Sequence, residues 1–489
     1  MVVSNRLPIV LERDEAGQLH AQEGSGGLVS AMQPILAESG GSWIGWLGSS
    51  DLGDARSLLG RAERQLGFRL HDVELSEEEV VNYYQGLANE VLWPLCHDQL
   101  DRCRFEPIYW RTYEQVNRKF AAAVAACTSA EDFVWIHDYH LTRVAAALRE
   151  AGIERRLGFF LHIPFPAADL FAALPWRAQV IEGLLSHSLV GFQTVRDLDN
   201  FVACLARLGG GEVVEDGGAL RRVRRPDGAV VTLAAAPISI DYQGMVERAA
   251  EIDVDETLAD LRARMSAERL ILGVDRLDYS KGIPQRLAAF DLALERYPEL
   301  RGRVSLLQVV VPSRVEVEEY QALEREIDRL VGSINGKYWE PGWTPVLYAF
   351  RSLSKAELLA YYRASDVALV TPLKDGMNLI CKEYCACSLR DDGVLVLSEF
   401  AGAAAQLGEH CLLVNPYDVE QSAAAIHEAL SMDLEARSAR MRALRRSIER
   451  EDIFWWVEGF TSLLPRSPPG ARPRRRASAP VLQGGISIE

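Results

Sequence analysis

The feature that most constrains the fold is a regular alternation of short β-branched runs and helix-like segments after about residue 266. Strands are expected at 270–274, 304–311, 346–350, 367–370, 393–398 and 411–414. Helices are expected at 284–296, 317–330, 377–387 and 419–432, and another begins at the capping box Ser354-x-x-Glu357. Strands that alternate with helices form a parallel sheet covered on both faces, so this half is predicted to be a doubly wound α/β domain.

The first half of the chain repeats this pattern with more insertions. Strands are expected at 2–4, 43–46, 133–136, 158–162 and 189–192, with helices at 27–38 and from the capping box Ser76-x-x-Glu79 onward. A glycine- and charge-rich stretch at 209–228 predicts a surface hairpin ahead of a linker near 237–241. Two doubly wound, Rossmann-like domains in one chain would face each other across a cleft.

These patterns predict the domain boundaries. We expect an N-terminal domain at 1–236, a C-terminal domain at 237–452, and a helix at 453–464 that packs back on the N-terminal domain. The remainder, 465–489, is rich in proline, arginine and serine. Such a composition buries too little apolar surface to offset the entropy of ordering, so a disordered basic tail is expected there.

Charge and cysteine usage restrict the partners and the compartment. The 489 residues include 69 acidic and 53 basic side chains, a net charge of −16, so no nucleic-acid or membrane partner is expected. Any anionic ligand must instead be held by a local basic cluster. No apolar run approaches the roughly 20 residues of a membrane span, and no signal peptide is evident. Eight cysteines without zinc-site spacing suggest reduced thiols in a cytoplasmic protein without a metal.

Several common catalytic motifs are missing. The segment 332–337 is one residue short of a P-loop and is followed by Tyr338 instead of serine or threonine. Neither a nucleophile elbow nor an H-E-x-x-H zinc helix occurs, and the glycine run at 24–27 lacks the third glycine of a dinucleotide fingerprint. His137 and His140 flank Asp138, but no carboxylates are spaced nearby to complete a metal site.

Basic side chains follow several of the predicted strands. Arg276 and Lys281 follow the strand at 270–274 in the segment DRLDYSKG, Arg314 follows the next strand, and Arg6 follows the first strand of the chain. Open α/β sheets bind ligands at the carboxyl ends of their strands. The four cations are therefore predicted to line one anion-binding edge of an acidic protein.

A second candidate segment is TPLKDGMNLICKEY. Asp375 and Gly376 precede the predicted helix, so the backbone N–H groups of 377–379 would be available to a diphosphate. Glu383, about two turns into the helix, could accept hydrogen bonds from a ribose diol, and Asp375 one from a sugar hydroxyl. The alternative is that Asp375 only caps the helix.

Twelve motifs in one order then make a specific resemblance. They are SNRLP, GSGGLVSA, GGSWIGW, LWPLCHD, VWIHDYHL, GFFLHIPFP, LVGFQT, GVDRLDYSKGI, INGKY, LVTPLKDGMNL with KEY, VLSEFAGAA and LLVNPYD. From about residue 1 to 463 the chain resembles the trehalose-6-phosphate synthase family. The resemblance implies a two-domain GT-B fold and a retaining transfer of glucose from UDP-glucose to glucose 6-phosphate. It implies neither a metal nor a cofactor.

The resemblance also implies a role for individual residues. Matches to donor-binding positions are Gly27, His162, Arg276, Lys281, Asp375, Gly376, Met377, Asn378, Leu379 and Glu383. Matches to acceptor-binding positions are Arg6, Trp46, Tyr84, Trp93, Asp138 and Arg314. The catalytic set is expected to be Arg276, Lys281, His162, Asp138 and Asp375. Departures from the family pattern are Ser239, where glycine is usual, the cysteine-rich KEYCAC segment, and the basic tail.

Some alternatives stay open at this stage. A sister transferase could use another acceptor, such as glycerol 3-phosphate to give glucosylglycerol phosphate, and a catalytically silent sugar-phosphate sensor could keep the same fold. Because the sequence offers no second acid obviously paired with Asp375, front-face transfer assisted by the leaving phosphate is favoured over a carboxylate nucleophile. UDP leads GDP and ADP as the donor nucleotide, and the chain could form a homodimer or a homotetramer.

Overall fold

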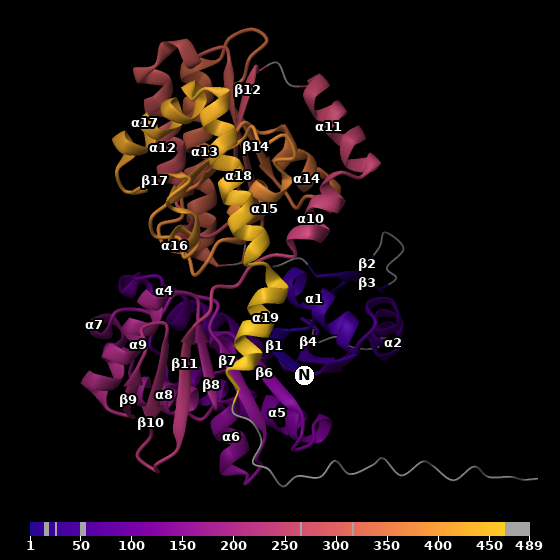
Figure 1. The fold of residues 1–489 in the computed structure, drawn as a ribbon, viewed down its shortest axis with the longest axis vertical. Helices are drawn as coiled ribbons and strands as arrows, with labels where there is room; N and C mark the ends of the chain where they lie inside the picture. The colour runs from indigo at the N-terminus through magenta and orange to yellow at the C-terminus, as the bar shows by residue number, and fades with distance from the viewer. Residues whose placement is uncertain (14–18, 25–26, 49–54, 265–266, 315–316, 465–489) are drawn as a thin grey trace, which may run out of the picture.

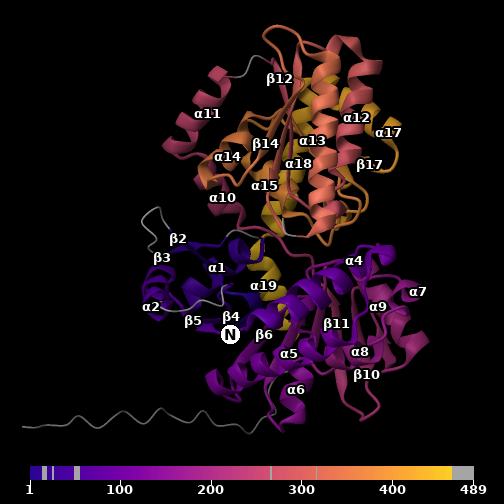
Figure 2. The ribbon, with the colours of Figure 1, turned by 180° about the vertical axis from the view of Figure 1, so that it is seen from behind.

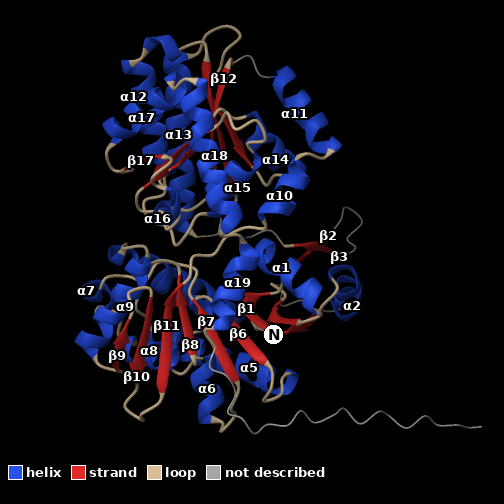
Figure 3. Ribbon diagram, viewed as in Figure 1, coloured by secondary structure: helices blue, strands red, loops and turns tan. Residues whose placement is uncertain are grey.

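The computed structural model describes residues 1–489 except 14–18, 25–26, 49–54, 265–266, 315–316 and 465–489, so the predicted disordered tail lies outside the described residues. Two α/β bodies are stacked along the long axis, one built from each half of the chain (Figure 1; Figure 3). The predicted class, two doubly wound α/β domains, is confirmed. No helix among the described residues is long and apolar enough to cross a membrane.

The N-terminal body contains a nine-stranded sheet within the described residues, in the order β5-β4-β1-β6-β7-β8-β11-β10-β9. The strands are β1 (Val2–Arg6), β4 (Ser42–Trp46), β5 (Arg69–Asp72), β6 (Phe133–His137), β7 (Arg156–Phe160), β8 (Leu189–Phe192), β9 (Glu212–Asp216), β10 (Leu220–Arg224) and β11 (Val230–Ala235). Pairing is parallel from β5 to β11 and antiparallel in β11-β10-β9, so the predicted hairpin at 209–228 extends the sheet edge. A separate antiparallel pair joins β2 (Ile9–Arg13) to β3 (Leu19–Glu23).

The C-terminal body has a parallel six-stranded sheet in the described part of the chain, in the order β14-β13-β12-β15-β16-β17. The strands are β12 (Arg269–Arg276), β13 (Val304–Val311), β14 (Val346–Phe350), β15 (Val367–Val370), β16 (Val394–Ser398) and β17 (Leu412–Val414). Every strand predicted for this half is present, because buried parallel strands read as nearly continuous runs of β-branched residues.

Helices cover both sheets. In the N-terminal body they are α1 (Gly27–Ser39), α2 (Ala55–Leu66), α3 (Glu77–Glu79), α4 (Trp93–Cys96), α5 (Pro107–Cys127), α6 (Val144–Glu150), α7 (Ala168–Phe171), α8 (Arg177–Leu185) and α9 (Val195–Leu208). In the C-terminal body they are α10 (Tyr242–Ala249), α11 (Ile252–Arg264), α12 (Ile283–Arg296), α13 (Glu318–Tyr338), α14 (Lys355–Ala364), α15 (Leu379–Cys387), α16 (Ala404–Leu407), α17 (Val419–Ser431) and α18 (Leu434–Arg450). Both predicted capping boxes are formed, at Ser76 and at Ser354.

The helix that Ser76 caps continues as a π-helix over Val80–Leu92 and then as α4. A π-helix widens the turn, and such turns occur often at functional sites.

The last described helix, α19 (Ile453–Ser462), leaves α18 and lies against the N-terminal body (Figure 2). The rings of Trp456 and Phe460 stack on Trp135 of β6, with centroids 4.8 and 4.7 Å away, and both meet Phe160 of β7 edge-on. The chain therefore crosses between the bodies twice, once before α10 and once before α19.

Candidate active site

Trp93 of the N-terminal body lies against two arginines of the C-terminal body. It begins α4 of the N-terminal body, and its ring lies 5.7 Å from the guanidinium carbon of Arg276 and 4.8 Å from that of Arg314. Arg276 ends β12, and Arg314 follows β13 with a positive φ of 51°. The carboxyl ends of two adjacent C-terminal strands are therefore packed against an aromatic ring of the other body.

A second aromatic group lies at the carboxyl ends of the N-terminal strands. Arg6 ends β1, and its guanidinium carbon lies 4.6 Å from the ring centre of Trp46 and 5.4 Å from that of Tyr84. Burial alone would raise the pKa of the Tyr84 hydroxyl, but the positive charges of Arg314, Arg6 and Arg276 lower it below its usual value. Three of the four predicted cations thus converge on Tyr84.

The fourth predicted cation, Lys281, has a carboxylate partner. Its Nζ lies 2.5 Å from Oδ2 of Asp375, and both side chains are almost enclosed, at 12% and 14% exposure. Burial favours the neutral form of Asp375, but the Lys281 ammonium and a hydrogen bond from Asn378 hold the pKa of this carboxyl below its usual value. Both residues are among the predicted donor-binding residues, and the structure joins them as an ion pair.

The helix after Asp375 starts later than predicted. The helix expected at 377–387 begins at Leu379, because Asn378 takes a left-handed conformation with φ 70° and is the N-cap residue. Asp375 is therefore not the helix cap, which was the alternative interpretation of this residue. The Asn378 side-chain oxygen is buried without a hydrogen-bond partner.

Gly376 touches the opposite body. A Cβ atom at this position would overlap the carbonyl oxygen of His162, which follows β7. The His162 ring lies against His137, with Nε2 3.0 Å from Nδ1, and burial lowers the pKa of His162 to about 3. A neutral imidazole therefore lies beside a backbone contact that only glycine permits.

Asp138 follows β6 in a strained loop. Its φ is 75°, an uncommon value for a residue with a side chain, and its carboxylate accepts a hydrogen bond from the His162 backbone N–H at 3.2 Å. Burial raises the pKa of Asp138 to about 7, although backbone hydrogen bonds and Arg276 act in the opposite direction. Small changes of environment would therefore change its protonation near neutral pH.

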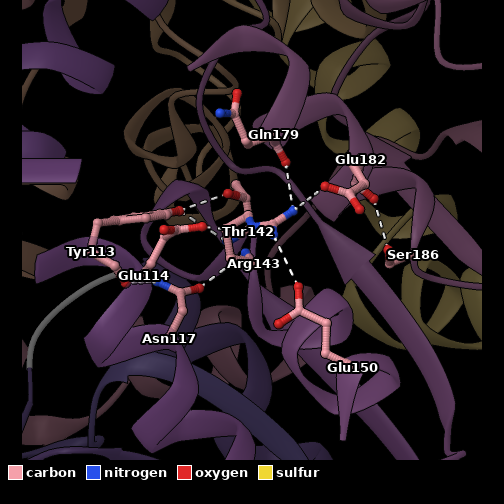
Figure 4. A network of polar contacts seen from close by, with 9 residues as sticks. All are labelled: Tyr113, Glu114, Asn117, Thr142, Arg143, Glu150, Gln179, Glu182 and Ser186. Carbon is pink, nitrogen blue, oxygen red and sulfur yellow. Dashed lines mark hydrogen bonds and ion pairs between the residues drawn. The ribbon is translucent and has the colours of Figure 1, made fainter. Parts of the chain in front are cut away.

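The side chains that hold this loop are not among the residues predicted from the sequence. From α5, the Tyr113 hydroxyl donates to the Tyr139 carbonyl at 2.7 Å and accepts from the Thr142 N–H at 3.0 Å. Asn117 donates to the His140 carbonyl at 3.1 Å. Its side-chain oxygen accepts from the backbone N–H of Arg143 at 3.0 Å (Figure 4). Their i, i+4 spacing indicates a shared helix face, but no local signal indicates which loop that face holds.

Arg143 then ties the end of the loop to two neighbouring helices. Its guanidinium lies 2.9 Å from Glu182 of α8 and 3.4 Å from Glu150 of α6, and it donates to the Gln179 carbonyl at 3.0 Å (Figure 4). The loop that presents Asp138 is therefore fixed by contacts from several helices.

Replacing Asn117 with alanine is expected to lower both stability and turnover. The change leaves the His140 carbonyl and the Arg143 N–H buried without partners, at a cost of about 1–3 kcal/mol for each group. Thermal unfolding should show a lower Tm, and kcat should fall about tenfold because the Asp138 loop loses a constraint. Arg118→Ala, an exposed position on the same helix, is the control. Unchanged turnover in a destabilised Asn117→Ala protein would limit Asn117 to a structural role.

A cavity of about 430 Å³ lies between α1, the segment before α10, α14 and α15, and its walls include Gly27, Ser239, Leu379 and Glu383. Glu383 accepts a hydrogen bond from the Tyr362 hydroxyl at 2.7 Å, and burial raises the pKa of its carboxyl. A Cβ atom on Gly27 would come within 2.8 Å of the Leu379 side chain, so α1 and α15 are nearly in contact. The cavity therefore has residues of both bodies in its walls.

The structure gathers the predicted residues into connected groups. The arginine–aromatic group contains Arg6, Trp46, Tyr84, Trp93, Arg276 and Arg314. Asp138 contacts the His162 backbone, and the Arg276 charge acts on its carboxyl. Lys281, Asp375, Gly376 and His162 form a second group, and Gly27, Leu379 and Glu383 line the cavity. Among the described residues, no group of three or more His, Cys, Asp and Glu side chains could hold a metal ion.

The chain has two α/β domains built on parallel sheets, and charged groups at the strand ends of both domains lie between them. This is the architecture of GT-B glycosyltransferases. The family model of glycosyltransferase family 20 matches residues 1–466. The chain therefore belongs to glycosyltransferase family 20.

Comparisons with individual proteins support this family assignment. The trehalose-6-phosphate synthase of Mycolicibacterium smegmatis is 42% identical over 471 residues, which cover 95% of this chain and 92% of the relative. The UDP-forming alpha,alpha-trehalose-phosphate synthase of Burkholderia xenovorans, solved with glucose-6-phosphate, matches with a TM-score of 0.85 and 33% identity, covering 95% of this chain and 99% of that one. An E. coli structure bound with UDP-2-fluoro glucose matches with a TM-score of 0.82 and 36% identity, covering 95% and 99%.

Proposed function

We propose that this protein transfers glucose from UDP-glucose to glucose 6-phosphate with retention, giving trehalose 6-phosphate and UDP. The observation that carries the proposal is that Arg6, Arg276 and Arg314 gather on the rings of Trp46, Tyr84 and Trp93. Their positive charges also lower the pKa of Tyr84. Such a cluster in an acidic protein suits the phosphate groups of two substrates. The relatives solved with glucose-6-phosphate and with UDP-2-fluoro glucose support both ligands.

The donor is proposed to bind mainly to the C-terminal body. Glu383 at the cavity wall accepts hydrogen bonds from the ribose, and Arg276 and Lys281 hold the diphosphate together with backbone N–H groups of 377–379. Asp375 and His162 hold the transferred glucose. Gly27 and Gly376 permit close approach, since a side chain at either position would meet the neighbouring body.

The acceptor is proposed to bind mainly to the N-terminal body. Arg6 and Arg314 grip its phosphate, since guanidinium groups match phosphate geometry. Tyr84 supplies a hydroxyl, while Trp46 and Trp93 have buried ring N–H groups without hydrogen-bond partners. Asp138 accepts hydrogen bonds from the acceptor hydroxyls.

The chemistry follows from this placement. The bond between the glucose anomeric carbon and the diphosphate oxygen breaks as charge grows on that oxygen, and Arg276 and Lys281 stabilise this charge. The acceptor hydroxyl oxygen forms the new bond on the same face, and its proton passes to the leaving phosphate. A carboxylate nucleophile would need a second acid paired with Asp375, whereas the side chains that contact the Asp375 carboxylate among the described residues are Lys281 and Asn378.

A direct assay tests the proposal. The purified protein is mixed with UDP-glucose and glucose 6-phosphate, and UDP release is followed while the anomeric configuration of the disaccharide is read by NMR. We expect UDP together with an α,α-linked product. Turnover with glycerol 3-phosphate but not glucose 6-phosphate would favour the sister transferase, and binding of the sugar phosphate without turnover would favour a sensor.

The acceptor KM is expected to rise at low pH. Asp138 accepts hydrogen bonds best as a carboxylate, and burial raises its pKa to about 7 in the free protein. Binding favours the charged form, so affinity is full above pH 7 and is lost as pH falls below it. Between pH 8 and pH 6 the KM for glucose 6-phosphate should rise by about tenfold. In Asp138→Asn only the titration of the substrate phosphate should remain, and an identical pH profile in both proteins would remove Asp138 from this role.

We also propose a cytoplasmic location. All eight cysteines are free, and six of them are buried. Burial raises the pKa of thiols such as Cys381 and Cys385, so they are unreactive packing groups of the kind found in reducing compartments.

A further inference from the structure

Lys382 on α15 is a buried cation outside the sites described above. Its side chain is fully buried, and its Nζ donates to the Ile238 carbonyl at 2.9 Å and to Oγ of Ser239 at 3.3 Å. Both acceptors are neutral, and burial lowers the pKa of Lys382 to about 8, although Cys381 and Glu451 act in the opposite direction. Burying an ammonium group costs folding free energy unless an ion pair or hydrogen bonds compensate for the lost water. The burial of Lys382 against two neutral acceptors therefore needs an explanation.

The two acceptors belong to the first crossing between the bodies, the segment Ala236–Ile240 between β11 and α10. Its other polar groups are held from the N-terminal side and by α19. Gln193, after β8, accepts the Ile238 N–H at 3.0 Å, and the Trp456 ring N–H donates to the Ala236 carbonyl at 2.8 Å. Lys382 is therefore the side chain by which the C-terminal body holds the Ile238 carbonyl.

This crossing is also a wall of the cavity. Ser239 and Ile240 line it, and Glu383, the residue after Lys382, lines it from α15. Gln193 donates in turn to the His162 carbonyl at 3.4 Å. A Cβ atom at position 376 would overlap this same carbonyl oxygen. Polar contacts thus run from Lys382 through the crossing to the contact between His162 and Gly376.

We propose that Lys382 is a positioning residue for the nucleotide sugar: by clamping Ile238 and Ser239 onto α15, it fixes the cavity wall opposite Glu383 and keeps the two halves of the donor site in register. The inference rests on the proposed function, because it takes the cavity as the place of the donor nucleoside. Lys382 touches no substrate and acts through the main chain of the crossing.

Lys382→Met tests the clamp, since methionine fills similar space but donates no hydrogen bond. UDP binding is measured by titration calorimetry without acceptor, together with the KM for each substrate and the Tm. The Kd for UDP and the donor KM are expected to rise about tenfold or more, because charge-assisted hydrogen bonds are lost, while the acceptor KM changes less than about twofold. Tyr384→Phe, on the same helix as Lys382, is the matched control: it removes a buried hydrogen bond to the Ser365 carbonyl at the end of α14, and should lower the Tm without changing the Kd.

A Lys382→Met protein that binds UDP like the wild type, whatever its Tm, would overturn the inference. If that variant does not fold, Ser239→Ala removes one acceptor with little change of volume and should weaken UDP binding about two- to fivefold; wild-type affinity there would equally overturn it. The wild-type titration separates the two proposals. A wild-type protein that binds no UDP overturns the proposed function and this inference with it, whereas a wild-type protein that binds UDP and variants that bind it equally well count against Lys382 alone.

Discussion

Arg276→Ala is expected to lower the rate of glucosyl transfer by about 10²- to 10³-fold while the protein stays folded. The guanidinium would stabilise charge that grows on the diphosphate only as its bond to glucose breaks, and losing one such preorganised group costs about 3–4 kcal/mol in other enzymes. Arg276 is exposed at the end of β12 and forms no ion pair with another described residue, so its removal breaks no salt bridge of the described chain. The effect should therefore appear in kcat with a Tm close to that of the wild type.

Lys281→Met should cause a loss of activity of similar size, but with a lower Tm. The ammonium also balances the Asp375 carboxylate at 2.5 Å in an enclosed pair, so its removal leaves an uncompensated charge. Lys337→Ala, which removes a surface lysine paired with Asp291 and Glu295, is the control and should change neither quantity appreciably. Full turnover in either Arg276→Ala or Lys281→Met would reject the role of that residue at the leaving group.

The sequence predicts the fold well because the strands of the C-terminal body are buried on both faces. Runs such as Val304–Val311 carry the strand signal within themselves, and the capping boxes at Ser76 and Ser354 mark helix starts locally. The position of the site follows from the same pattern. Parallel strands place their carboxyl ends together, so Arg276 and Arg314 could be expected at one edge before any coordinate was known.

The contacts within the site depend on residues far apart in the sequence. Lys281 and Asp375 are separated by 94 positions, and nothing near either residue specifies the other as its partner. The left-handed turn at Asn378, which delays α15 by two residues, arises where Gly376 packs against the opposite body. The Asn117 contacts likewise join a helix face to a distant loop. Such features depend on tertiary packing, which short-range periodicity does not encode.

Arg6→Ala is expected to raise the KM for glucose 6-phosphate by about 10- to 150-fold, because a charge-assisted hydrogen bond contributes about 1.5–3 kcal/mol to binding. Arg6 is exposed at the end of β1, with its guanidinium over Trp46 and Tyr84. The rings orient the guanidinium group but do not use its N–H donors. These donors are proposed to hydrogen-bond the acceptor phosphate. UDP binding measured without acceptor should change little, because the proposed diphosphate ligands lie on the other body.

The competing explanation is that Arg6 only stabilises the aromatic group through its contacts with Trp46 and Tyr84. In that case Arg6→Ala would lower the Tm and leave the acceptor KM unchanged, whereas the phosphate role predicts a raised KM with a small change in Tm. Arg6→Lys separates the two further: a lysine keeps the charge over the rings but cannot offer the planar fork, so it should recover only part of the lost affinity. Full recovery by lysine would mean that the site requires a positive charge at this position but not the guanidinium geometry.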